Sequence, residues 1–196
     1  MKDQQTSDFY AREANAYTAK TKQLASPQLS AFMARLEAGA AVLELGCGSG
    51  RDSEALLAAG FDVIPTDGTP EMAAIAETRL GRAVKVLLFE DIADVDTYDG
   101  VWANACLLHV PREQLPSVIG RIHTALRRGG VFYASYKTSG EEGRDQFGRY
   151  YNRPNANWLK QVYELQSWSN LGITKGHEPG YFGEPSDWLY VTAIKA

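Results

Sequence analysis

The chain has 196 residues, of which 44% are hydrophobic and 22% are charged, an ordinary composition for one globular domain. Its formal net charge of −4 argues against a basic nucleic-acid-binding surface, and its two cysteines favour neither a disulfide scaffold nor a zinc cluster. The sequence has no apolar run long enough to span a bilayer, and residues 1–7 lack the apolar run of a secretory signal. We therefore expect a cytoplasmic protein that binds neither nucleic acid nor membranes.

The first forty residues carry two helical patterns. Tyr10, Ala14 and Tyr17 are spaced to share one face of a helix. A second helix is predicted to begin with Ser26 as N-cap and Pro27 in its first turn, and to continue to Leu36. Both patterns precede the alternating elements that make up the rest of the chain.

Short apolar strands then alternate with amphipathic helices. Strands are predicted at 41–45, 61–66, 84–89, 100–105 and 131–136, with a last antiparallel edge pair near 171–175 and 188–195. Helices are predicted at 52–59, 70–80, 115–126 and 157–165. This alternation is typical of βαβ units, so we predict a single α/β domain, 1–196, with a doubly wound, mostly parallel sheet between helical layers.

Residues 137–154 interrupt the alternation. They are polar and glycine-rich and carry charges of both signs. Because strand and helix patterns resume on both sides, we interpret this segment as a functional loop rather than a linker.

A glycine-rich turn follows the first strand, with Gly46, Gly48 and Gly50 in G-x-G-x-G spacing. Glycines between a strand and a helix let a ligand approach the backbone closely, although tight packing alone is an alternative explanation. The dinucleotide motif needs its third glycine one residue later, where this chain has Arg51. The spacing therefore argues against a nicotinamide dinucleotide.

Acidic residues follow the second and third strands. Asp67 comes 21 residues after Gly46 and is predicted to accept hydrogen bonds from ribose hydroxyls, unless it only caps the turn before Gly68. Asp91 is predicted to accept from an adenine amino group with Ile92 packed on the ring, unless it is a solvated loop acid. Since strands of a parallel sheet end at one edge, the glycine turn and these carboxylates are predicted to meet there.

The residues at this edge resemble those of class I S-adenosylmethionine-dependent methyltransferases. The similar stretches are 42–50, 67–72, 90–91, 98–103 and 126–132, in the order that the family has them. The resemblance covers about residues 40–136, and 188–195 resembles the family's last strand. It implies a seven-stranded Rossmann-like sheet with an antiparallel last strand in a core at 39–196, behind a helical lid at 1–38.

The resemblance also implies S-adenosylmethionine as cofactor, S-adenosylhomocysteine as product and no metal. The cofactor-binding residues that it implies are Tyr10 and Tyr17 in the lid, Gly46, Cys47, Gly48 and Gly50 at the methionine part, Arg51 at its carboxylate, Asp67 and Gly68 at the ribose, Met72, Asp91 and Ile92 at the adenine, and Asn104, Ala105 and His109 beside the approaching substrate. For Arg51, a plain surface arginine is the alternative.

A small-molecule acceptor fits this chain best. The family members that methylate amino groups of nucleic acids have an Asn/Asp-Pro-Pro-Tyr run where 104–107 has neither proline nor an aromatic residue. Residues of the polar loop are predicted to contact a polar or anionic acceptor: Tyr136, Lys137, Arg144, Arg149 and Tyr150. The alternative is a solvated loop whose arginines and aspartates pair. An aromatic wall of Tyr181, Phe182 and Trp188 is a further hypothesis, with core packing as its alternative.

Methyl transfer is an in-line displacement that depends mainly on alignment and the exclusion of water. His109 is the best candidate for a general base, with a structural histidine as the alternative. Three functions stay open: a small-molecule methyltransferase, which we favour, a nicotinamide-dependent reductase, and a non-catalytic protein that binds adenosyl ligands. The chain is expected to be a monomer or a homodimer.

Overall fold

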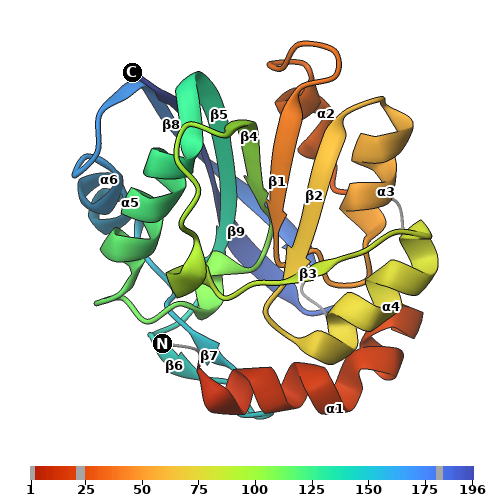
Figure 1. Ribbon diagram of the computed structural model, residues 1–196. Helices are drawn as coiled ribbons and strands as arrows, with labels where there is room; N and C mark the ends of the chain where they lie inside the picture. Colours follow the sequence, from red (N-terminus) through yellow and green to blue (C-terminus); the bar gives the residue numbers. More distant parts are fainter. Residues whose placement is uncertain (1–2, 21–24, 180–182) are drawn as a thin grey trace.

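A mixed sheet forms the centre of the computed structural model, which describes residues 3–20, 25–179 and 183–196. Within these residues the sheet has seven strands, in the spatial order β3-β2-β1-β4-β5-β9-β8 (Figure 1). Their bounds are β1 Ala41–Leu45, β2 Asp62–Asp67, β3 Lys85–Val86, β4 Tyr98–Ala103, β5 Leu126–Lys137, β8 Trp168–Pro179 and β9 Pro185–Lys195. The first five strands pair in parallel, and β9 runs antiparallel to both neighbours, β5 and β8. The predicted fold class is confirmed.

Helices cover both faces of the sheet (Figure 1). They are α1 Gln4–Lys20, α2 Leu29–Met33, α3 Arg51–Ala58, α4 Pro70–Leu80, α5 Leu115–Ala125 and α6 Ala156–Tyr163. Alternate side chains of β1 point to opposite faces, so Val42 packs with Phe32 of α2 and Leu56 of α3, whereas Leu43 belongs to the cluster that includes α5 and α6. The doubly wound arrangement follows from burial of both sheet faces.

Most elements differ from their predicted bounds by a few residues, β8 being longer at both ends, and three of the differences have a local explanation. Helix α2 is one short segment, because Ser26 does not cap it: the Ser26 amide donates to the Asp52 carboxylate and its hydroxyl donates to Gln28. Strand β3 has two residues and is followed by the 3-10 helix η1 Phe89–Asp91. Strand β5 begins at Leu126 rather than at 131, since residues 127–130 form an irregularity within the strand, where Gly129 has a φ of +78°.

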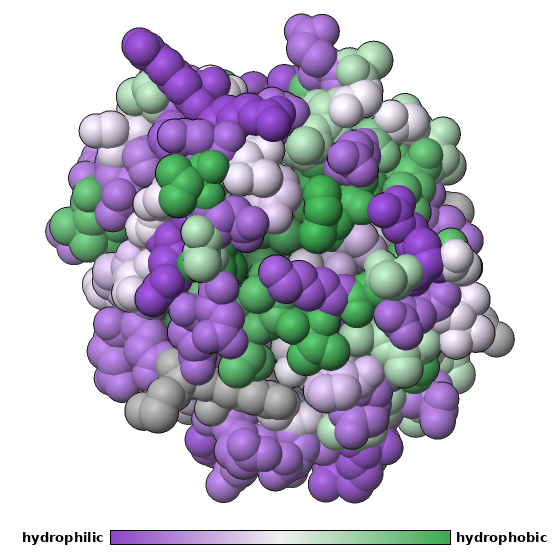
Figure 2. All heavy atoms as spheres, viewed as in Figure 1, coloured by the Kyte–Doolittle hydropathy of each residue, from purple (hydrophilic) through white to green (hydrophobic). Residues whose placement is uncertain are grey.

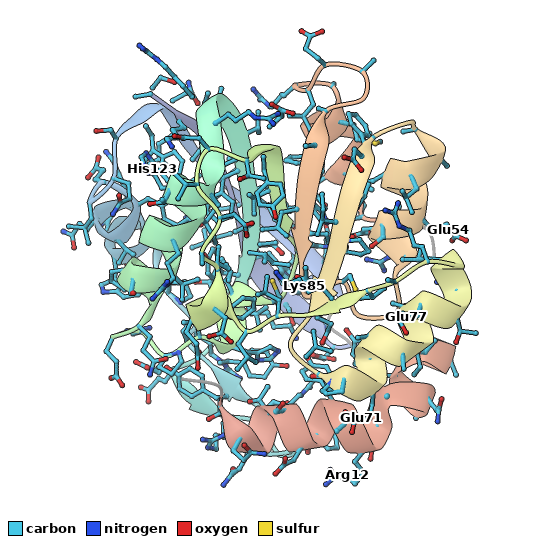
Figure 3. The ribbon with its side chains drawn as sticks, in the orientation of Figure 1. Arg12, Glu54, Glu71, Glu77, Lys85 and His123 are labelled. Atoms are coloured by element: carbon cyan, nitrogen blue, oxygen red, sulfur yellow. The ribbon has the colours of Figure 1, made fainter. Side chains whose placement is uncertain are left out.

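The polar loop at 137–154 forms a hairpin that packs against α1. Its strands are β6 Gly143–Arg144 and β7 Tyr150–Tyr151. In Figure 1, α1 crosses the lower edge of the sheet, with this hairpin beside its N-terminal end and α4 near its other end. Arg12 projects from α1 away from the sheet (Figure 3), so the opposite side of the helix faces the strand ends. None of the described helices is long and apolar enough to cross a membrane.

Candidate cofactor and acceptor site

A cavity lies between α1 and the carboxyl ends of the parallel strands. We call α1 the roof helix. Five groups of residues line the cavity: Asp3, Thr6, Ser7, Tyr10 and Tyr17 in the roof helix or directly before it; Glu44, Gly46, Cys47, Gly48, Ser49, Arg51 and Asp52 around the glycine turn; Asp67, Gly68, Thr69 and Met72 at the end of β2 and after it; Leu87, Leu88, Phe89 and Glu90 after β3; and Asn104, Ala105, Cys106, His109, Val110, Gln114 and Val118 after β4. Most of the predicted cofactor-binding residues are therefore brought together at one edge of the sheet.

The glycine turn presents backbone to the cavity. Gly46 and Gly48 have φ of +64° and +58°, in the left-handed region that favours glycine. A Cβ at Gly46 would lie 2.5 Å from the Cβ of Cys106, so the turn and the segment after β4 approach as closely as glycine permits. Gly50 does not line the cavity, which corrects its predicted role. It precedes α3, and a Cβ there would lie 3.2 Å from Leu80 of α4.

Asp67 anchors the glycine turn at the end of β2. Its carboxylate is buried and accepts from the Gly48 amide at 2.9 Å and from the Thr69 amide at 2.8 Å. The bond to Thr69 is the turn-capping role that the sequence left as the alternative. The bond to Gly48 ties the carboxylate to the turn, so Asp67 does both. Each oxygen retains accepting capacity for a ligand hydroxyl.

The structure does not place Asp91 and Ile92 in the cavity wall. Asp91 is exposed, and Ile92 is buried in the core, where its carbonyl accepts from Arg121. The chain turns into η1 directly after β3, and this turn brings Leu88, Phe89 and Glu90 to the cavity instead. Apolar side chains gather in the middle of the face seen in Figure 2, where Figure 1 draws β3 and Val86 is half exposed.

The Glu44 carboxyl, beneath the glycine turn, has a raised pKa. It is buried at the end of β1 and bonded to Ser53. Burial, reinforced by the nearby Asp52 carboxylate, raises the pKa of Glu44 to about 8. The carboxyl is therefore mostly protonated at neutral pH, and a cationic group brought near it would favour its ionised form.

The two cysteines are small buried residues of the wall. Both line the cavity, and the Cys106 thiol contacts the Leu45 carbonyl at 3.1 Å. Burial is the main cause that raises the pKa of each thiol well above its ordinary value. Neither is a thiolate at neutral pH, so both act here as small packing residues.

A hydrogen-bonded chain joins the roof helix, His109 and the hairpin. Nδ1 of His109 lies 2.6 Å from the Tyr150 carbonyl oxygen, which only accepts, so Nδ1 carries the proton. Burial lowers the pKa of His109 to about 4, so the ring is neutral at pH 7. Nε2 is then an acceptor, and the Tyr10 hydroxyl donates to it at 2.9 Å. Tyr17 packs edge-on against Tyr10, with ring centroids 5.3 Å apart.

The other predicted cofactor-binding residues lie around these groups. Arg51 donates to Asp52 at 3.0 Å, and Met72 is buried below the glycine turn. Asn104 and Ala105 form the turn directly after β4. Among the residues that the structure describes, no group of three or more His, Cys, Asp or Glu side chains is arranged to hold a metal ion.

The predicted acceptor contacts of the loop require correction. Tyr136 is fully buried and bonds to Tyr163 in the core, because β5 continues through this position. Lys137 pairs with Glu184 at 2.9 Å, and Arg144 pairs with Asp3 at 2.7 Å. The Tyr150 hydroxyl bonds to Glu142. None of these side chains lines the cavity.

Arg149 is the fifth predicted acceptor residue and is also held within the fold. It pairs with Asp145 at 2.7 Å, and its guanidinium lies 4.7 Å from the centre of the Phe9 ring. The charges of the hairpin therefore pair mainly with each other and with the roof helix, which is the alternative that the sequence left open. Trp188 is partly buried on β9, and Tyr181 and Phe182 lie outside the described residues.

Several wall residues escaped prediction from the sequence. Glu44 and Asp52 flank the glycine turn, and two acidic residues so close to that turn could have been predicted to line the site. Asp3, Thr6 and Ser7 precede the aromatic pattern of the roof helix and carry no motif. Gln114 directly precedes α5, and Val118 lies on that helix, whose apolar stripe predicts only core packing.

Comparisons with known proteins agree with this geometry. Residues 42–130 match the family model described as a methyltransferase domain. A ubiquinone biosynthesis O-methyltransferase of Xanthomonas axonopodis is 33% identical over 116 residues, which are 55% of this chain and 48% of that protein. An uncharacterized methyltransferase of Synechocystis is 31% identical over 96 residues, 48% of this chain and 45% of that protein. The matches thus span about half the length of these curated relatives.

Solved structures share the fold over nearly the whole chain. The 1,6-didemethyltoxoflavin-N1-methyltransferase of Burkholderia thailandensis, crystallised with 1,6-didemethyltoxoflavin and S-adenosylhomocysteine, has a TM-score of 0.76 at 25% identity, over 97% of this chain and 87% of that one. The phosphoethanolamine N-methyltransferase 2 of Haemonchus contortus with S-adenosylmethionine has a TM-score of 0.77 at 15% identity, over 97% of this chain and 60% of that one. The second likeness concerns the fold alone.

Proposed function

We propose that the chain transfers a methyl group from S-adenosylmethionine to a small-molecule acceptor. In support, residues 42–130 match a methyltransferase domain model, and the seven-stranded Rossmann-like fold is shared with a methyltransferase crystallised with S-adenosylhomocysteine. One observation carries the proposal. The glycine turn, held by the buried Asp67 carboxylate, lines a cavity that the roof helix covers at the carboxyl edge of the sheet. Ligands of open α/β sheets bind at this edge.

The residues at this edge fit an adenosyl ligand. Gly46 and Gly48 leave a cradle without Cβ atoms, and Asp67 offers acceptors for a ribose diol. The described wall has the carboxylates of Asp67 and Glu90, and those of Asp3 and Asp52, which pair with Arg144 and Arg51. The Glu44 carboxyl, mostly protonated at neutral pH, would ionise more readily beside a positively charged ligand, so this wall suits a cationic ligand. S-adenosylmethionine, when bound, supplies a methyl group on a positively charged sulfur.

The chain's own residues bind and orient the cofactor and the acceptor, exclude water, and move a proton. The roof helix covers part of the cavity, and the exclusion of water there strengthens electrostatic interactions. For an acceptor that keeps its proton at neutral pH, the Tyr10 oxygen accepts that proton as Tyr10 passes its own to Nε2 of His109. The Tyr150 carbonyl then stabilises the doubly protonated ring through Nδ1.

A small acceptor is favoured by two features. The cavity lies between the sheet edge and a helix that is fastened to the hairpin, an arrangement that favours an acceptor of small size. In addition, the relatives named above include proteins whose names give ubiquinone biosynthesis and 1,6-didemethyltoxoflavin.

Calorimetric titration with S-adenosylmethionine, S-adenosylhomocysteine and NAD(H) tests the cofactor, and S-adenosylhomocysteine release with a panel of hydroxyl, amine and heterocyclic acceptors tests the reaction. We expect micromolar binding of both adenosyl ligands and turnover with a small acceptor. Binding of NAD(H) alone would favour the reductase. Adenosyl binding without turnover on any acceptor would favour the non-catalytic alternative.

A further inference from the structure

Asp52 is a carboxylate of the cavity wall that accepts four hydrogen bonds. It is buried at the start of α3. Oδ1 accepts from the Ser26 amide and from Nε of Arg51, each at 3.0 Å. Oδ2 accepts from Nε1 of Trp102 and Nδ2 of Asn104, each at 3.1 Å. One carboxylate thus joins α3, the end of β4, and the segment that follows the roof helix.

The bond to Asn104 fixes a strained turn. Because Asp52 only accepts, the amide nitrogen of Asn104 faces it, and Oδ1 is left to accept from the Ser135 hydroxyl at 2.8 Å. The same Ser135 oxygen accepts from the Ala105 amide at 2.7 Å. Ala105 has a φ of +53°, a conformation that is strained for a residue other than glycine and persists only when its surroundings hold it.

We propose that Asp52 is a positioning residue that holds the Asn104–Ala105 turn in place beside the reacting end of the cavity. The inference rests on the proposed function and extends it to a residue that takes no part in the proton transfer between Tyr10 and His109. Asn104 and Ala105 line the cavity next to His109, and the chain of bonds Asp52–Asn104–Ser135–Ala105 sets where their polar atoms lie. Through Ser26 the same carboxylate ties this turn to the chain that leaves the roof helix.

Asp52→Asn tests the role with little change in shape. The new amide nitrogen is a donor that faces donors, so at least one of the four bonds is lost. The matched control is Asp99→Asn: Asp99 also accepts from a backbone amide, that of Ala41, and from an arginine, Arg127, but it lies at the start of β4, away from the cavity.

The main readout is hydrogen exchange of the Ala105 amide, followed by NMR. We expect exchange to accelerate at least about tenfold in Asp52→Asn and to stay unchanged in Asp99→Asn. Calorimetry is expected to find S-adenosylhomocysteine affinity within about threefold of wild type, and kcat about tenfold or more lower with an acceptor from the screen. Unchanged Ala105 exchange, or an equal loss of affinity and kcat, would overturn the proposal.

A second variant covers the case in which Asp52→Asn does not fold. Asn104→Ala breaks the same chain of bonds one step later and leaves Asp52 its other donors. Faster Ala105 exchange in this variant supports the proposal, and unchanged exchange refutes it. Failure of the wild-type protein to bind S-adenosylhomocysteine would instead refute the proposed function, whatever Ala105 exchange shows.

Discussion

The Tyr10 hydroxyl lies 2.9 Å from Nε2 of His109, although 99 residues separate the two in the chain. The contact links the roof helix to the segment after β4. It also gives His109 a defined tautomer, because its other ring nitrogen donates to the Tyr150 carbonyl. The Tyr10 hydroxyl therefore carries a proton that it can pass on, and Nε2 of His109 is the atom that can receive it.

Loss of the pair is expected to slow the reaction rather than weaken cofactor binding. With an acceptor that must lose a proton, Tyr10→Phe and His109→Gln should each lower kcat about 100-fold, since general-base catalysis contributes that much or more. Steady-state kinetics measures kcat, and calorimetry measures the affinity for S-adenosylhomocysteine. Tyr98→Phe, which changes a tyrosine at the start of β4, is the control. Full activity in both variants at every pH would contradict the relay.

The neutral state of His109 predicts how stability depends on pH. Its folded-state pKa is about 4 against an ordinary value of 6.5, so the unfolded chain binds the extra proton first. Stability from this group is present above pH 6.5 and is lost as pH falls towards 4, by about 3 kcal/mol. Urea denaturation at pH 7 and pH 4.5 should therefore show a smaller loss in His109→Gln than in wild type. If wild type and His109→Gln lose equal stability between the two pH values, the pKa of His109 is not lowered by burial.

Asp67→Ala should weaken S-adenosylhomocysteine binding about 10- to 100-fold, because a hydrogen bond to a charged group contributes about 1.5–3 kcal/mol. The variant removes both the anchor of the glycine turn and the acceptors offered to a ribose. Asp62→Ala, at the exposed start of the same strand, should bind as wild type does. Calorimetry compares the three proteins. Wild-type affinity in Asp67→Ala would mean that the ligand binds elsewhere.

Gly46→Ala should abolish cofactor binding and lower the melting temperature. Its Cβ would lie 2.5 Å from the Cβ of Cys106, on a backbone with positive φ. Gly60→Ala separates the two causes, because φ there is +87° but nothing lies within 4 Å of the added carbon. That control is expected to lose only about 1 kcal/mol of stability and to bind normally. If both variants behave alike, the close approach to Cys106 has no effect of its own.

The ion pair between Arg144 and Asp3 fastens the hairpin to the roof helix. Arg144→Ala should raise the rate of proteolysis within the roof helix and weaken cofactor binding about two- to fivefold, as expected for a partly exposed pair. Arg127→Ala removes a comparable pair with Asp99, remote from the cavity, and should change neither. Limited proteolysis with and without S-adenosylhomocysteine provides the measurement. Equal protection of both variants would show that the pair does not hold the roof.

The sheet could be predicted from the sequence because the signals for its strands, turns and helices lie in residues that are close together in the chain. The strand at 41–45, the glycine turn and the helix that starts with Pro70 depend on neighbouring residues, and the structure has them. Asp91 was misjudged because a 3-10 turn after a two-residue strand shifts which side chains reach the edge. The loop was misjudged because the partner of Arg144 is Asp3, and no local pattern reveals an ion pair across 141 residues.

The roof is therefore built from distant parts of the chain, and this sets an order of assembly. During synthesis the roof helix emerges early, whereas Arg144 and Tyr150, which hold it, follow more than 140 residues behind Asp3 and Thr6. A growing chain has its glycine turn and Asp67 long before the cavity is covered. A ligand that needs the roof binds only after the hairpin has folded. Its binding therefore stabilises chains in which the hairpin is in place, and partly folded chains gain no stability from it.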